Sequence, residues 1–117
     1  GRYGVGWPTR AAPSRLVRPA RRQRMVVGLV VWELHLAGCA SLKEKRQVVK
    51  SLKDRLHNRF NVSVAETGHQ DVLQRAELAA CLVSGDRRHA QSVLASVDRM
   101  VEEESGARII DSCTTFY

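Results

Sequence analysis

Acidic and histidine side chains stand close together at two places in this 117-residue sequence, and such pairs can serve in acid–base catalysis. Glu33 and His35 are two residues apart, and His69-Gln70-Asp71 places a histidine and a carboxylate in a short polar segment. Alternate residues of a strand lie roughly 6.5 Å apart, too far for a direct hydrogen bond unless the side chains lean together. No nucleophile accompanies either pair. We therefore interpret Glu33 and His35 as a solvated or partner-facing sheet surface, and His69-Gln70-Asp71 as a turn.

Other catalytic and metal-binding patterns are absent from the sequence. It contains no G-x-x-x-x-G-K-[ST], G-x-G-x-x-G or G-x-S-x-G motif. Cys39, Cys81 and Cys113 are far apart and have no spacing typical of a disulfide framework or a zinc site, which fits a reducing cytoplasm. We therefore expect no enzymatic activity, no cofactor, no metal and no small-molecule substrate.

The clearest chemical pattern is cationic and suits the binding of phosphates. Residues 41–59 hold seven Lys or Arg residues against two acids. At about 100° per residue, five side chains align in one narrow row beside an apolar arc, at spacings of three and four. We name this row the basic stripe; its members are Lys43, Arg46, Lys50, Lys53 and His57. The alternative interpretation is a solvated helix face that provides solubility.

The elements that must position these residues follow from hydrophobic periodicity and capping signals. Ser41 with Glu44 forms a capping box for the basic helix, and Asp86 is a plausible N-cap of a second helix. Strands are predicted at 26–36, 60–66, 72–83 and 107–117, and helices at 41–59 and from 86 to about 105. This β-α-β-β-α-β order predicts an α+β, ferredoxin-like sandwich, in which two helices cover one face of a four-stranded antiparallel sheet.

This fold class includes RNA readers that stack bases on aromatic residues of the central strands. Here the first strand offers only Trp32, which alternation places on the inward face, and the third strand has no aromatic residue. Recognition of bases on the sheet is therefore disfavoured, and any nucleic-acid contact is expected through phosphates on the basic stripe.

The net charge of +7 arises in the first 24 residues, which hold seven arginines and no acid. Residues 25–117 balance 12 basic residues with 12 acids. We expect residues 1–24 to be a disordered basic extension, and residues 25–117 to form one domain. Three origins of the extension stay open: a nucleic-acid-binding tail, a transit peptide, or translated upstream sequence before a start at Met25. The abrupt change in composition favours the third.

The segments SLKEKRQVVKSLKDRLHNRFNVSVAE and QDVLQRAELA resemble the YlxP-like family of small bacterial proteins, over essentially all of residues 25–117. The resemblance implies a ferredoxin-like fold. Members are often encoded among genes for translation initiation, transcription elongation and ribosome maturation, which implies a role near ribosomes or rRNA. The matching positions are Lys43, Lys45, Arg46, Lys50, Arg55, Arg59, Asn61, Ser63, Glu66, Asp71, Gln74 and Arg75. Among these, Gln74 and Arg75 are expected to hold the hairpin against Glu66 or Asp71.

Two functions follow as hypotheses. The first is a cytoplasmic, non-enzymatic accessory protein that binds rRNA or a ribosomal subunit through the basic stripe. The second is a protein-interaction or dimerisation module, in which the open sheet face with Leu29 and Val31 pairs with a second copy. A membrane role is not expected, because no run of eighteen apolar residues occurs.

Overall fold

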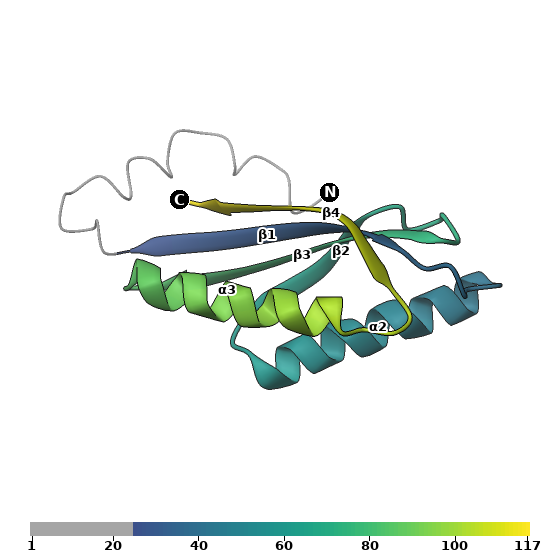
Figure 1. The fold of residues 1–117 in the computed structure, drawn as a ribbon, viewed down its shortest axis with the longest axis horizontal. Coiled ribbons are helices and arrows are strands. Elements are labelled where there is room, and N and C mark those ends of the chain that lie inside the picture. The colour runs from purple at the N-terminus through teal and green to yellow at the C-terminus, as the bar shows by residue number, and fades with distance from the viewer. Residues whose placement is uncertain (1–24) are drawn as a thin grey trace, which may run out of the picture.

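A computed structural model of the protein describes residues 25–117 and places six elements in the predicted order (Figure 1). They are β1 (Val26–His35), α2 (Leu42–Arg59), β2 (Ser63–Gly68), β3 (Arg75–Ser84), α3 (Arg87–Glu102) and β4 (Arg108–Phe116). The strands form one sheet in the order β2-β3-β1-β4, and every neighbouring pair is antiparallel. The prediction of a ferredoxin-like α+β sandwich is confirmed. The extension predicted for residues 1–24 lies outside the described residues.

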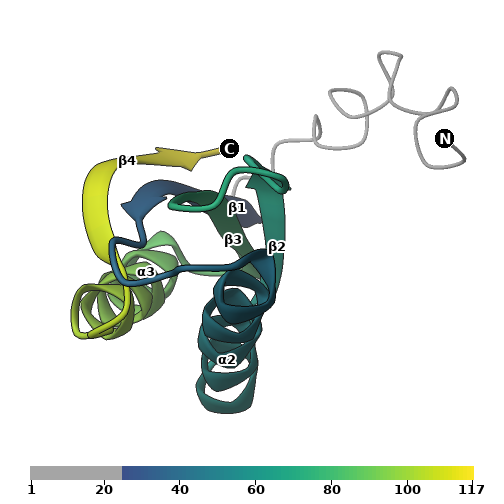
Figure 2. The ribbon, with the colours of Figure 1, turned by 90° about the vertical axis from the view of Figure 1, so that its right-hand side faces the viewer.

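Both helices lie on the same side of the sheet, and the core forms between the two layers (Figure 2). Burial alternates along β1 and β3, so one face of each strand packs against the helices. Trp32 is 0% exposed at the centre of this core, as the alternation predicted. Its indole N–H donates to Asp98 on α3 at 2.8 Å, which satisfies the one polar group of a buried tryptophan.

Helix α3 begins at the predicted cap. The Asp86 side chain accepts from the backbone N–H of Arg88 at 2.9 Å, and this bond satisfies one of the unpaired donors of the first turn. Buried residues then recur at spacings of three and four, which is the apolar stripe of a helix packed on a sheet. They are Ala90, Leu94, Val97 and Val101.

The hairpin of β2 and β3 is where the observed boundaries differ from the predicted ones. Phe60 was predicted to open the second strand, but it is the C-cap of α2 and its N–H donates to the carbonyl of Leu56. Strand β2 starts three residues later, at Ser63. The pairing of β2 with β3 shifts register between Glu66 and Gly68, which extends β2 beyond its predicted end. The turn and the start of β3 therefore lie further along the chain than the alternation indicated.

Candidate functional site

The capping box of α2 forms, with one change from the predicted contacts. The Ser41 hydroxyl accepts from the Glu44 backbone N–H at 3.1 Å, as expected. The Glu44 carboxylate accepts from the N–H of Ala40, at 2.6 Å, rather than from the N–H of Ser41 itself. The contact of Ser41 satisfies one of the donors that a helix start leaves unpaired, and the contact of Ala40 ties the preceding connector to the first turn.

The basic stripe is accessible over its whole length. Four of its side chains are exposed and Lys53 is half-buried; the exposed ones are Lys43, Arg46, Lys50 and His57. The stripe starts one residue inside α2 and ends in its last turn, so it runs along almost the full helix. Its cations can therefore meet an extended row of phosphates without rearrangement of the core.

An acid interrupts the stripe. The Lys50 ammonium lies 2.8 Å from the Asp54 carboxylate, one turn further along α2. This hydrogen bond raises the pKa of Lys50 and lowers the pKa of Asp54, and the attraction of the two charges adds to both shifts. Both groups are solvent-exposed, so the pair is weak and Lys50 can exchange its partner for a phosphate.

Two further arginines of α2 lie off the stripe. Arg55 forms an ion pair with Glu104, just beyond α3. The Arg59 guanidinium lies 6.0 Å from the centre of the Phe60 ring. Four of the seven basic residues of α2 are set aside: Lys45, Lys50 and Arg55 form ion pairs, and Arg59 lies off the stripe. The other three are cations of the stripe that have no ion-pair partner among residues 25–117. The three are Lys43, Arg46 and Lys53.

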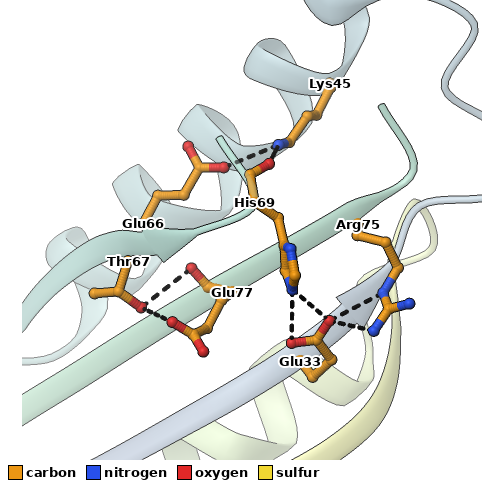
Figure 3. Close-up of polar contacts among 7 residues, drawn as sticks. All are labelled: Glu33, Lys45, Glu66, Thr67, His69, Arg75 and Glu77. Carbon is orange, nitrogen blue, oxygen red and sulfur yellow. Dashed lines mark hydrogen bonds and ion pairs between the residues drawn. The ribbon is translucent and has the colours of Figure 1, made fainter. Parts of the chain in front are cut away.

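Lys45, one of the positions that match the family resemblance, is a buried cation (Figure 3). Its side chain points from α2 beneath the β2–β3 hairpin and is 0% exposed. The ammonium lies 3.1 Å from the Glu66 carboxylate, and it donates to the backbone carbonyls of His69 and Gln70. A buried charge needs such partners, so these contacts tie the hairpin to the start of α2.

A sequence signal for Lys45 existed. It stands four residues before Val49 and seven before Leu52, and these are the spacings of the apolar face itself. Lys45 thus lies within the apolar arc rather than on the basic stripe. Its partner Glu66 lies in β2 at a half-buried position, as the burial pattern of that strand shows. A lysine within an apolar arc predicts a buried acid from the facing element.

A second polar cluster lies on the opposite, open face of the sheet and joins three elements (Figure 3). The Glu33 carboxylate of β1 accepts from Nε and Nη2 of Arg75 at the start of β3, with 2.9 Å to Nε. Nε2 of His69, in the turn, lies 2.9 and 3.2 Å from the two Glu33 oxygens. Glu33 therefore pairs with His69 and Arg75, and this contact brings together the Glu33-His35 pair of β1 and the His69-Gln70-Asp71 turn.

His69 connects the two clusters through the hairpin turn. Its backbone adopts φ = 60°, the only positive value among non-glycine residues of the described part of the chain. Its side chain contacts Glu33 on the open face, while its carbonyl accepts from buried Lys45 on the helix side. Both contacts hold a backbone conformation that costs energy for a residue with a Cβ atom.

The predicted roles of Gln74 and Arg75 are corrected by these contacts. Arg75 pairs with Glu33, and neither Glu66 nor Asp71 is its partner. The Gln74 amide donates to the carbonyls of Ala37 and Cys39, both at 3.4 Å. The hairpin is therefore anchored to β1 and to the connector that follows it, because the β1–β3 register sets Arg75 opposite His35, next to Glu33.

The part of the chain that is similar to known proteins coincides with the folded domain. Residues 27–114 match a family described as "Protein of unknown function (DUF503)". The chain belongs to this family. The DUF503 match covers β1 through most of β4 and leaves the arginine-rich residues 1–24 outside. A curated relative, the "Uncharacterized protein YlxP" of Bacillus subtilis (strain 168), is 39% identical over 83 residues, covering 68% of this chain and 90% of the relative. The YlxP-like resemblance is confirmed.

Two solved structures are similar to this DUF503 domain, both at low sequence identity and low TM-score. One is a C-terminal segment of the alpha subunit of aIF2 from Pyrococcus abyssi, with 17% identity and a TM-score of 0.42 over 79% of this chain and 49% of the other. The second is a de novo designed protein with a ferredoxin fold, with 17% identity and a TM-score of 0.43 over 79% and 82%. The fold assignment itself stands on the strand order and pairing described above.

Thiols and possible metal ligands of the DUF503 domain are dispersed. Cys39 is buried, Cys81 is half-buried and Cys113 is exposed, and all three are free. Burial raises the pKa of the Cys39 thiol, and the nearby charge of Glu44 adds to this shift. Within residues 25–117, no group of three or more His, Cys, Asp or Glu residues could hold a metal ion. No helix in that range is long and apolar enough to cross a membrane.

Proposed function

We propose that this DUF503 protein is a non-enzymatic accessory factor of the translation machinery, and that its basic stripe binds the phosphate backbone of structured RNA such as rRNA. The observation that carries the proposal is the accessibility of Lys43, Arg46 and Lys53 on one face of α2, where they have no ion-pair partner in the described part of the chain. Phosphate contacts of this kind give affinity without base recognition.

Spacing along α2 supports the proposal. The members of the stripe recur every three or four residues, and a helix rises 1.5 Å per residue. Neighbouring cations therefore lie about 4.5 to 6 Å apart along the axis, and the stripe spans about 21 Å. A row of this length is long enough to face several consecutive phosphates of one strand.

A non-enzymatic role is the simpler account of the Glu33 cluster. Both oxygens of Glu33 are engaged by His69 and Arg75. Within residues 25–117, no Ser, Thr or Cys side chain makes a hydrogen bond to His69 that would mark a nucleophile. The contacts of this cluster anchor the hairpin, which is a structural task.

Filter binding with radiolabelled rRNA tests the proposal on the full chain and on residues 25–117, because the seven arginines of residues 1–24 could bind RNA by themselves. The double variant Lys43→Glu/Arg46→Glu should weaken binding in both. The matched control is Arg87→Glu/Arg88→Glu, which makes the same charge change in the first turn of α3. Equal losses for both variants, or loss only on removal of residues 1–24, would contradict a role for the stripe.

A further inference from the structure

The sheet face that points away from the helices is divided into an apolar half and a charged half. The apolar half lies toward the start of β1, and Val83 there is 68% exposed. Strand register brings the side chains of this half together. The apolar ones are Val27, Leu29, Val31, Ala65, Ala79, Cys81 and Val83, and the same rows also contain Ser63 of β2 and Cys113 and Thr115 of β4. An exposed apolar surface of this kind typically marks an interaction site.

A shallow hollow of about 310 Å³ opens in the apolar half. Leu29 borders it, and its floor is made by the small side chains of Ser63, Ala65, Ala79 and Cys81 on β2 and β3. Because these neighbouring residues are small, the surface is recessed beside the larger side chains of β1. The hollow can therefore receive one bulky apolar side chain from outside the molecule.

The charged half consists of two rows across the sheet. Register sets Arg75, His35 and Arg108 in the outer row, and Glu77, Glu33 and Asp111 in the row between this and the apolar half. Glu33 forms an ion pair with Arg75 and lies in contact with the His69 imidazole, and Glu77 accepts from the Thr67 hydroxyl at 2.7 Å.

Arg75 is prepared to bind a further carboxylate. A guanidinium has five N–H donors, and the contacts with Glu33 use one on Nε and one on Nη2. Its side chain is 44% exposed, so the remaining donors can meet solvent or a ligand. The pairing with Glu33 fixes the orientation of the guanidinium plane, which lowers the entropy cost of binding a carboxylate there.

We propose that the open sheet face docks one amphipathic helix of a partner protein, with a bulky apolar side chain in the hollow and a carboxylate on Arg75. The centre of the hollow lies near the level of Ala80, five residues from Arg75 along β3, which corresponds to about 17 Å. A helix covers this distance in about eleven residues, or three turns, and returns to the same side. A basic side chain about seven residues from the apolar one would then pass over Glu77 and Asp111.

A second copy of the chain fits this face less well than a helix does. Suppose that the open faces of two copies pack on each other with the two-fold axis parallel to the strands. The row of Arg75 would then face the same basic row of the other copy, and the row of Glu77 would face the same acidic row, so like charges would meet. A two-fold axis perpendicular to the strands at the level of Leu29 would place the two apolar halves on each other. Arg75 would then lie past Met25 of the other copy, where the described residues offer no carboxylate. A two-fold axis between the charged rows pairs opposite charges but leaves the apolar half uncovered. A helix satisfies both halves at once.

Selecting helical peptides that bind the full chain tests the inference. The probe is a phage-displayed library of 20-residue helices randomised on one face, followed by fluorescence anisotropy of the enriched peptides. We expect a bulky apolar residue and an acidic residue ten to twelve positions apart. Ala65→Trp, which fills the hollow from the exposed edge strand β2, should weaken binding at least tenfold, whereas Ala95→Trp on the exposed side of α3 should not.

Charge exchange gives the second measurement and guards against a folding defect. Arg75→Glu should weaken binding, and replacing the acidic residue of the peptide by arginine should restore it; Arg88→Glu on α3 is the control. Enriched helices without this spacing, no enrichment, or binding that Ala65→Trp leaves intact would each overturn the proposal. A dimer in sedimentation equilibrium that Ala65→Trp dissociates would assign the face to a second copy and overturn it as well.

Discussion

Lys45 provides the sharpest test of how the hairpin is attached to α2. Replacing it with methionine keeps an unbranched side chain of similar length and removes the ammonium group. The Glu66 carboxylate, which is 18% exposed, then loses its ion partner, and the carbonyls of His69 and Gln70 lose a donor. We expect Lys45→Met to lower the free energy of unfolding although it increases hydrophobicity.

The expected loss of unfolding free energy follows from the burial of the Lys45–Glu66 ion pair. Breaking a buried ion pair by removing one partner costs about 3–5 kcal/mol, because the other charge is left without compensation. Glu66 keeps some contact with water, so the loss should lie near the lower limit, at about 3 kcal/mol. Glu66→Gln should cost about 1–2 kcal/mol, since Lys45 keeps both carbonyl acceptors and the amide oxygen can still accept.

Urea denaturation followed by far-UV circular dichroism measures these values for a domain of this size. In a double-mutant cycle, Lys45→Met/Glu66→Gln should cost less than the sum of the single changes, by about 1–2 kcal/mol. Lys43→Met is the matched control on the exposed stripe and should change stability by no more than about 0.5 kcal/mol. A loss for Lys45→Met as small as that of the control would refute the buried pair.

Three further predictions concern other parts of the domain. Asp54→Asn should free Lys50 and raise RNA affinity by a factor on the order of two to five, measured by filter binding. Because the native contact lowers the pKa of Asp54, its stabilising effect is present above the unfolded pKa and disappears as pH falls through the folded pKa; the variant should therefore lack this part of the acid dependence in urea titrations. Gly28→Ala should cost about 1–3 kcal/mol in the same titrations, since its Cβ would lie 2.9 Å from an α3 side chain. In thiol labelling with mass spectrometry, Cys113 should react well before the buried Cys39, and simultaneous modification would contradict the described burial.

The fold was predictable because its signals are local. Strict alternation in β1 and β3, a cap before each helix and two apolar stripes defined the element order and the inward side of Trp32. The ends of the hairpin were not predictable in this way. The register shift next to Gly68 and the positive φ of His69 depend on contacts with distant residues, so the local residue types do not predict them.

Some features of the candidate site were likewise predictable from local sequence, and others were not. Exposure of Lys43 and Arg46 followed from helix periodicity alone. The pairing of Glu33 with His69 could not be inferred, because it depends on the β1–β3 register and on the shape of the turn, 36 residues away. Lys45 was recoverable from its position in the apolar arc, but the identity of its acidic partner required the placement of β2 beside α2.

The salt dependence of RNA binding tests the central proposal most directly. Three cations of the stripe have no ion-pair partner within residues 25–117, so for this segment the plot of log affinity against log salt should have a slope of about −2 to −3. Lys43→Glu/Arg46→Glu should reduce the slope to about −1 or abolish binding, whereas Arg87→Glu/Arg88→Glu should leave it unchanged. A salt-independent affinity, or the same slope for both variants, would contradict phosphate binding by the basic stripe.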